Sequence, residues 1–426
     1  MSNITELNDK LEAHSQQLKE PAGMTEKRLK AARLVDELDF PEIERSHYYR
    51  WLPLDTDNFN QPVKSQTELL PVNPSEDGAY LRTFHNEILD QYLPEELAEQ
   101  GVIFTTISQA MESHAELIEK HYMTDVVALD QDKLSAHHYA YMNAGVFLYI
   151  PENVEVKNPI QLHMIQDATS QKPFNQHVLI VMEENSQASF VEKMATEGSE
   201  ETPANIVIEI SAKENSRINY STIDDLSETT SAFIRRQAIC DAGANVDWAI
   251  GSMNNGNVVL DAYTELRGKG SQSDLKIVSL THGDQEQIIN SHILNIGAQT
   301  AGNIFQHGAI LDQSRLTFNA IGKIEKDAKN ADAQQESRLL MFSEGARGDA
   351  NPILLIEEYE VTAGHAASVG QIDEEQLYYL MSRGIHRKEA MRLAIRGFLG
   401  PVIQAIPLDS VRKELIDNIE RKLRSL

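Results

Sequence analysis

Histidine and cysteine are the residue types in this chain whose chemistry best suits a transition-metal site. His365 lies in a stretch of small residues, between Gly364 and the pair Ala366 and Ala367. A neutral imidazole is a good iron ligand, and small neighbours allow another backbone or a cluster to approach closely. A lone histidine is more often a hydrogen-bonded surface or core residue. The residues alone therefore make His365 a candidate ligand without deciding its role.

Cys240 is the only cysteine in the sequence. One cysteine cannot form an internal disulfide, and it cannot supply the set of thiolates that a self-contained iron–sulfur site needs. We interpret Cys240 as a small core residue at the end of a strand; the alternative is an exposed thiol that accepts a persulfide. His137 and His138 are adjacent, and adjacent side chains on a helix diverge, so we interpret both as structural.

Motifs of several common enzyme classes are missing from the sequence. It has no phosphate-binding loop, dinucleotide-binding glycine motif, zinc-protease motif or nucleophile elbow. Carbohydrate-active enzymes are an alternative, because β-solenoids often carry such sites and a basic series runs from Arg315 through Lys323, Lys326 and Lys329 to Arg338. The alternation of strand side chains favours a solvated exterior for this series over a catalytic face.

The overall charge of the chain limits its partners. Its 426 residues include 38 lysines and arginines and 65 acidic residues, which gives a net charge of −27. Such a surface repels phosphate backbones and anionic lipids, so nucleic-acid and membrane partners are disfavoured. The N-terminal residues lack the basic and apolar regions of a signal peptide, and no apolar run approaches the length of a membrane span. We therefore expect a cytoplasmic protein.

The spacing of apolar residues divides the chain into three regions. Residues 1–142 are expected to form an N-terminal helical domain with irregular connectors, of which the proline-rich stretch 43–80 is the longest. Residues 143–370 contain many short runs rich in Val, Ile, Thr and Phe, which predict strands. Residues 371–426 are expected to form a C-terminal helical domain, whose second helix should stop at 397–401.

The middle region predicts a β-solenoid. Helical periodicity is missing there, and Asn255-Gly256 is the one good match to a two-residue hairpin loop. Short strands without hairpin loops and without crossover helices favour a fold in which each strand stacks on its equivalent one turn along. A β-sandwich is the competing interpretation, because no repeat of fixed length is visible in the sequence.

Five stretches in the last quarter of the chain together resemble the SufB/SufD family, and most closely its SufD branch in Gram-positive bacteria. Shorter matches at 38–41, 49–51, 101–104 and 114–117 extend the resemblance over nearly the whole chain. The five stretches are 318–324 (FNAIGKI), 330–338 (NADAQQESR), 343–352 (SEGARGDANP), 362–370 (TAGHAASVG) and 373–384 (DEEQLYYLMSRG).

The resemblance implies a mainly β fold, in which a right-handed parallel β-helix is flanked by N- and C-terminal α-helical domains. It also implies a non-catalytic scaffold subunit for iron–sulfur cluster assembly. Such a subunit pairs with SufB and binds the ABC-type ATPase SufC through its C-terminal helices. The cluster would be assembled transiently in the complex, so the isolated chain is expected to hold no cofactor stably.

Two departures from the SufB pattern bear on the site. Where SufB carries an essential cysteine before the final strands, this chain has 346–349 (ARGD), and where SufB has a His-Glu pair, this chain has His365 and Ala366. The resemblance implies that His365 faces SufB across the subunit interface as a candidate iron or cluster ligand. A SufB-like subunit that holds a cluster alone is the alternative. An exposed terminal edge of the β-helix also favours pairing of two copies in a homodimer.

Overall fold

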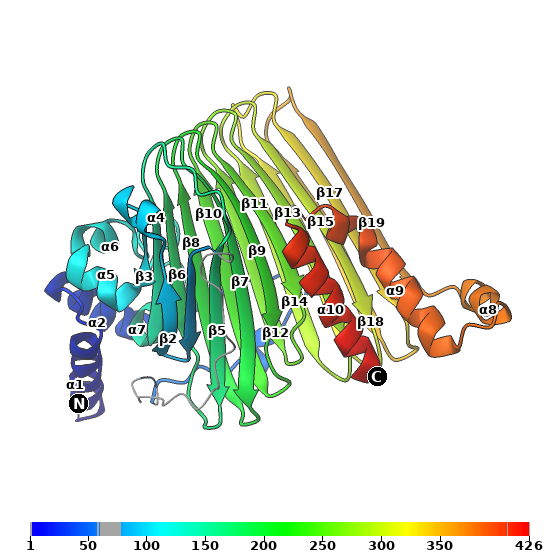
Figure 1. The fold of residues 1–426 in the computed structure, drawn as a ribbon, viewed down its shortest axis with the longest axis horizontal. Helices are drawn as coiled ribbons and strands as arrows, with labels where there is room; N and C mark the ends of the chain where they lie inside the picture. The colour runs from blue at the N-terminus through cyan, green and yellow to red at the C-terminus, as the bar shows by residue number, and fades with distance from the viewer. Residues whose placement is uncertain (1, 58, 60–77, 407, 426) are drawn as a thin grey trace.

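The computed structural model describes residues 2–57, 59, 78–406 and 408–425. It consists of two long sheets that lie face to face, with helices at both ends of the chain (Figure 1). The prediction of a mainly β fold with a parallel solenoid and flanking helices is therefore confirmed. No helix in the described part of the chain is long and apolar enough to cross a membrane.

The elements follow one another along the chain in three groups: mostly helices with short strands, then the long series of strands, then three helices. The helices are α1 Ser2–Gln17, α2 Ala22–Glu37, the short 3-10 helix η1 Tyr48–Arg50, α4 Glu95–Glu99, α5 Ile107–Ser113, α6 Ala115–His121, α7 Lys133–Tyr141, α8 Glu374–Ser382, α9 Arg387–Gln404 and α10 Asp409–Ser425. The strands are β1 Tyr80–Phe84, β2 Glu87–Tyr92, β3 Ile103–Thr106, β4 Ala144–Ile150, β5 Ile160–Ala168, β6 Gln176–Met182, β7 Gln187–Gly198, β8 Thr202–Ala212, β9 Arg217–Asp225, β10 Thr230–Cys240, β11 Asn245–Ser252, β12 Val258–Leu266, β13 Gln272–Thr281, β14 Glu286–Asn295, β15 Ala301–Ile310, β16 Arg315–Ile324, β17 Asp332–Met341, β18 Arg347–Ile356 and β19 Thr362–Gln371.

Successive strands of the solenoid alternate between the two sheets. From β4 onward the even-numbered strands belong to the nine-stranded sheet and the odd-numbered strands to the ten-stranded sheet. Each strand pairs in parallel with the strand two positions later, so residues at equivalent positions of successive turns stack in columns. The inward-facing columns are mostly aliphatic and form one continuous core between the sheets.

The corner after each even-numbered strand from β4 to β16 contains a residue in the left-handed backbone region. Glycine takes this conformation without strain and asparagine takes it more readily than most residues. The backbone N–H of each such residue from Asn153 to Asn330 donates to a carbonyl of the next turn. The spacing between neighbouring members of this column varies from 27 to 32 residues, which explains why the sequence shows no repeat of fixed length. The column consists of Asn153, Asn185, Asn215, Gly243, Gly270, Gln299 and Asn330.

Asn255-Gly256 does not form a hairpin. It lies in the connection between β11 and β12, and these strands belong to different sheets. A methyl group at Gly256 would lie 2.1 Å from the carbonyl oxygen of Thr230, so close packing between turns, not a hairpin turn, requires the glycine here.

The N-terminal region contains both helices and strands. Helices α5 to α7 cover the outer face of the first solenoid turns, whereas β1 to β3 fall in a range for which the sequence indicates only helices and connectors. Strand β1 pairs in parallel with β5, and β3 pairs antiparallel with β4, so both sheets begin before residue 143. The predicted extended stretch 43–80 is irregular around η1, and its part from 60 to 77 lies outside the described residues.

Helices α9 and α10 lie on the outer face of the ten-stranded sheet (Figure 1). Contrary to the sequence prediction, α9 does not stop at 397–401 but continues to Gln404 with Pro401 inside it. Proline removes one helical hydrogen bond. The buried side chains of Leu399, Val402 and Ile403 on both sides of it pack against the sheet, and this packing keeps the helix continuous.

Candidate functional site

The solenoid ends in two strands that each leave one edge open. Strand β19 is the last strand of the ten-stranded sheet and β18 the last of the nine-stranded sheet. Apolar side chains at this end are partly uncovered: Leu355, Ile356 and Val369 are 47%, 46% and 43% exposed, and Tyr359 is 99% exposed. Open backbone groups beside exposed apolar side chains are the features by which a strand edge pairs with another chain.

His365 is the last member of an inward-facing column. Parallel pairing places Trp248, Leu275 and Ile304 one after another in this column, followed by Gln335 on β17 and His365 on β19. The first three are buried in the core. The column therefore changes from apolar to polar in its last two turns, and His365 is exposed because no described turn covers it.

Gln335 is a buried polar residue directly beneath His365. Its side-chain Nε2 donates to the carbonyl of Ile353 across the lumen at 3.1 Å, whereas its Oε1 has no hydrogen-bond partner within the described residues. A methyl group at Gly322 would lie 2.5 Å from that Nε2, so a larger residue at 322 would displace the amide from its present position. The sequence signal for Gln335 is a polar residue at an inward position of a strand, which is visible only once the register of the turns is known.

The loop between β18 and β19 adds negative charge beside the open end. Glu358 accepts hydrogen bonds from the backbone N–H groups of Tyr359 at 2.8 Å and of Asp327 at 3.0 Å. These backbone donors hold the pKa of the Glu358 carboxyl below its ordinary value. Glu360 forms an ion pair with Lys329 at 3.8 Å. A cation approaching His365 would therefore meet a predominantly acidic rim.

His365 does not belong to a multi-residue metal-binding group in the described part of the chain. The described residues contain no group of three or more His, Cys, Asp or Glu side chains that could hold a metal ion. Cys240 is fully buried in the core, as its interpretation as a core residue predicts, and burial raises the pKa of its thiol well above the ordinary range. A site for iron or a cluster at His365 would therefore need ligands from another chain.

His137 and His138 are buried under the N-terminal helices, as expected for structural residues. The Nε2 of His137 lies 3.1 Å from the carbonyl of Asp55, and the Nδ1 of His138 lies 3.0 Å from the carbonyl of Asn205. The other ring nitrogen of His138 contacts the Nδ1 of His177 at 3.0 Å. These contacts use both ring nitrogens of His138 in a hydrogen-bonded chain that leaves no nitrogen for a metal.

The basic series lies on the outside of the solenoid beside acidic residues. Lys323 pairs with Glu325 at 2.5 Å, and Arg338 pairs with Glu336 at 2.9 Å. The series is therefore a solvated, charge-balanced surface, as the alternation of strand side chains predicts.

Helix α8 forms a second exposed feature near the same end. Figure 1 shows it at the tip of the C-terminal region, beyond the last strands. Only Leu377 of this helix is buried, whereas Tyr378 is 72% and Tyr379 is 57% exposed. The guanidinium of Arg383 lies 4.8 Å from the ring centre of Tyr379 and donates to its hydroxyl at 2.8 Å. These contacts hold an aromatic side chain in a fixed, solvent-facing position.

Two protein-family models match consecutive parts of the chain. The N-terminal region of SufBD proteins matches residues 78–162, and the SufBD core domain of the SUF system for iron–sulfur cluster assembly matches residues 164–398. The chain belongs to the SufBD family. The open end with β18, β19 and His365 falls within the SufBD core match, whereas α10 lies beyond it.

Curated SufBD relatives cover most of the chain. The iron–sulfur cluster assembly protein SufD of Bacillus subtilis is 39% identical over 97% of this chain and 97% of its own length. An iron–sulfur cluster assembly SufBD family protein of Staphylococcus saprophyticus is 24% identical over 88% of this chain and 81% of its own length. The cluster assembly protein SufB of Bacillus subtilis is 23% identical over 83% of this chain and 76% of its own length.

Proposed function

We propose that this chain is a non-catalytic SufD-type scaffold subunit that pairs with SufB and with the ATPase SufC during iron–sulfur cluster assembly. The observation that carries the proposal is the open end of the solenoid, where an inward-facing histidine is exposed and the described residues supply no group of three or more metal-binding side chains. A candidate ligand in this position is useful only if a partner completes the site.

SufB is proposed to pair with the edges of β18 and β19. A second SufBD-type solenoid would offer strands of the same kind, so the two sheets of each subunit could continue into those of the other. The exposed side chains of Leu355, Ile356 and Val369 would be buried by this pairing. A homodimer through the same edges would compete with SufB when the chain is isolated.

Iron or a nascent cluster is the cargo in this proposal, and His365 supplies one ligand for it. A neutral imidazole binds iron without adding negative charge, which suits a position beside Glu357, Glu358 and Glu360. The thiolates have to come from SufB, because the one cysteine of this chain is buried in the core.

SufC is proposed to dock on α8 and the adjacent exposed face of α9. Tyr378, Tyr379 and Met381 on α8 and Leu393 on α9 are exposed apolar side chains that the rest of the described chain leaves uncovered. Aromatic side chains are enriched at the centres of protein interfaces, because they bury a large area with few rotatable bonds.

Removal of residues 371–426 is not a clean test of this docking. Helices α9 and α10 cover Val278, Leu280 and other apolar residues on the outer face of the ten-stranded sheet. The truncation would expose this cluster and destabilise the solenoid itself. Substitutions restricted to exposed residues separate docking from folding.

The deciding experiment is co-purification of SufB with variants of the open edge. Leu355→Lys places a charge on the proposed pairing edge and should reduce SufB capture at least tenfold, because burying an unpaired charge is costly. Tyr49→Lys is the matched control, since Tyr49 is also 47% exposed but belongs to the N-terminal region. Equal capture by both variants would place the SufB contact elsewhere.

The ligand role of His365 is tested separately in cells that depend on this pathway. His365→Ala should leave SufB and SufC capture unchanged and sharply reduce the activity of iron–sulfur enzymes. Thr362→Ala changes an exposed residue of the same strand and should leave that activity unchanged. Normal enzyme activity with His365→Ala would make this subunit a purely structural partner.

A further inference from the structure

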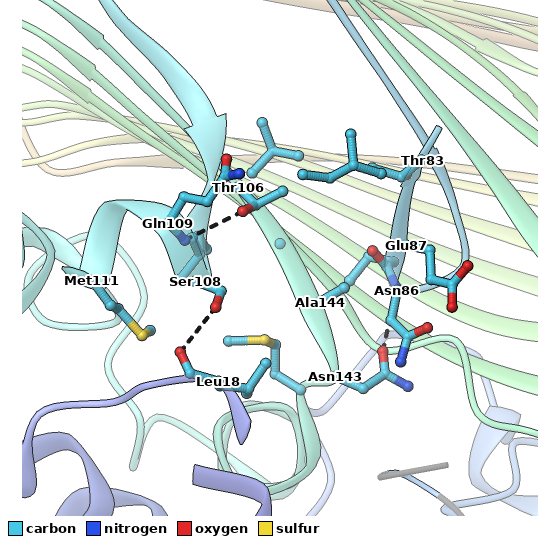
Figure 2. A pocket seen from close by; sticks show the side chains of 16 residues that line it. Leu18, Thr83, Asn86, Glu87, Thr106, Ser108, Gln109, Met111, Asn143 and Ala144 are labelled. Atoms are coloured by element: carbon cyan, nitrogen blue, oxygen red, sulfur yellow. Dashed lines mark hydrogen bonds between the residues drawn. The ribbon is translucent and has the colours of Figure 1, made fainter. Parts of the chain in front are cut away.

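A partly open pocket lies at the other end of the solenoid, between the N-terminal helices and the first turns (Figure 2). Its volume of about 460 Å³ is within the range of small-molecule sites in proteins. Five segments of the chain converge on it: the residue after α1, the hairpin of β1 and β2, the start of α5, the start of β4 and the start of β6. It is far along the chain from His365 and plays no part in the function proposed above.

The walls of this pocket are mostly apolar. Leu18, Ile107, Met111, Met142 and Val146 contribute aliphatic and thioether side chains. Methionine side chains adapt to ligands of irregular shape, because they are unbranched and polarisable. Such walls bind apolar atoms by removing them from water.

Two buried polar atoms without partners face the same pocket. The side chain of Thr83 is 5% exposed, and neither its Oγ1 nor the Oδ1 of Asn86 forms a hydrogen bond within the described residues. The nearby hydroxyl of Ser108 is occupied, because it donates to the carbonyl of Leu18 at 3.1 Å (Figure 2). A buried polar atom without a partner is destabilising, and a ligand with a hydrogen-bonding edge would satisfy it.

The charge of the lining selects the class of ligand. Glu87 is the one charged side chain among the described residues that line the pocket, and none of them is Lys, Arg or His. An anionic ligand would enter without a counter-charge and would face a carboxylate. We propose that this pocket binds an uncharged, mostly apolar small molecule of about two fused rings whose polar edge pairs with Thr83 and Asn86.

Three naphthalene derivatives of similar size test this proposal by calorimetric titration of the full-length chain. The probe 2-naphthol is neutral and offers a hydroxyl, 2-methylnaphthalene lacks the hydrogen bond, and 2-naphthoate adds a negative charge. We expect 2-naphthol to bind at one site per chain. Binding of 2-methylnaphthalene should be about fivefold weaker and that of 2-naphthoate at least tenfold weaker, because one loses a hydrogen bond and the other adds an unpaired charge.

Two variants locate the binding in the pocket. Thr83→Val keeps the side-chain shape and should weaken 2-naphthol about fivefold while leaving 2-methylnaphthalene unchanged. Ala144→Leu fills part of the pocket and should weaken both neutral probes at least tenfold. Thr317→Val removes a buried hydroxyl from the distant strand β16 and should change neither. No saturable binding of 2-naphthol, or binding that Thr83→Val leaves unchanged, would overturn the proposal even if Ala144→Leu fails to fold.

Discussion

Gln335 and His365 occupy paired positions on neighbouring strands, and both face the lumen of the solenoid where the preceding members of their column are apolar. The glutamine is buried by the turn above it, whereas the histidine is exposed at the end. The same column thus has two roles. Its apolar members contribute to the core, and its last member is accessible to a partner that binds the open end.

Substitutions at a buried and at the exposed terminal position of this column should differ strongly in their effect on stability. Trp248→Ala should lower the free energy of unfolding by about 3–5 kcal/mol, because it creates a cavity in the core. His365→Ala should change that free energy by no more than about 0.5 kcal/mol, because its side chain is exposed. Urea titrations of both variants measure the difference. A large loss with His365→Ala would mean that the histidine is structural.

Glu209 predicts a specific dependence of stability on pH. Its carboxyl is buried beneath the N-terminal helices, accepts the backbone N–H groups of Met123 and Val127, and lies 3.0 Å from the Nε2 of His177. Burial raises the pKa of Glu209 to about 8 and lowers the pKa of His177 to about 3. The folded state therefore keeps a proton on Glu209 at neutral pH that the unfolded chain releases.

A raised carboxyl pKa means that stability falls as the pH rises towards the folded-state value. Between pH 6.5 and 8, the free energy of unfolding of the natural chain should fall by about 1 kcal/mol per pH unit on average relative to Glu209→Gln, which cannot titrate. The titration of His177 in the unfolded chain is common to both proteins, so its contribution cancels in this difference. Parallel stability curves for the two proteins would show that Glu209 is already ionised when folded.

Lys422 should be important for attaching α10 to the solenoid. Its Nζ donates to the carbonyls of Met253 and Asn254 at 2.8 Å and of Leu280 at 3.1 Å, so it joins α10 to two turns of the solenoid. Lys422→Met keeps the apolar stem but removes these three hydrogen bonds, while the carbonyl of Asn254 still accepts from Gln285 and Gln287. We expect a loss of about 2–4 kcal/mol in unfolding free energy and faster hydrogen exchange in 409–425. Lys413→Met, on the exposed face of the same helix, should show neither effect.

Cys240 should resist thiol reagents in the folded protein. Its side chain is fully buried, and its raised pKa keeps the thiol protonated. Labelling with a disulfide reagent should therefore be at least a thousandfold slower in the native protein than in urea. Complete labelling of the folded chain within minutes would restore the alternative that this cysteine accepts a persulfide.

The two exposed tyrosines of α8 should contribute to SufC binding but not to the stability of the fold. Replacing Tyr378 and Tyr379 together with serine removes the aromatic surface without touching the buried Leu377. SufC capture should fall at least tenfold at an unchanged melting temperature, since interface aromatics often dominate binding. The single variant Tyr49→Ser is the control. Loss of SufC capture by this variant would mean that replacing any exposed tyrosine with serine weakens binding, wherever it lies.

The sequence predicts the architecture well because local composition decides it. Short β-branched runs without helical spacing favour strands, and the runs 146–150, 177–182, 205–210 and 352–356 all lie within strands. The short strands β1 to β3 could not be found in this way, since two of them alternate weakly and owe their conformation to pairing with β4 and β5. The continuation of α9 through Pro401 likewise depends on packing against the sheet.

The candidate site was only partly accessible from the sequence. His365 stands out because its neighbours are small, but its position at the end of an inward column depends on the register of six turns. Gln335 and the pocket around Thr83 depend on residues that lie far apart in the chain and meet only after folding. Neither leaves a local pattern.

The corner column from Asn153 to Asn330 also determines where this chain tolerates a change in length. A residue added within a strand would turn every later inward side chain of that strand towards solvent. A residue added at a corner bulges outward, and turns that differ by as much as five residues already stack in one column. Insertions acquired during evolution should therefore be found mostly at these corners. Peptide tags should also be tolerated there, because a longer corner leaves both the core and the open end unchanged.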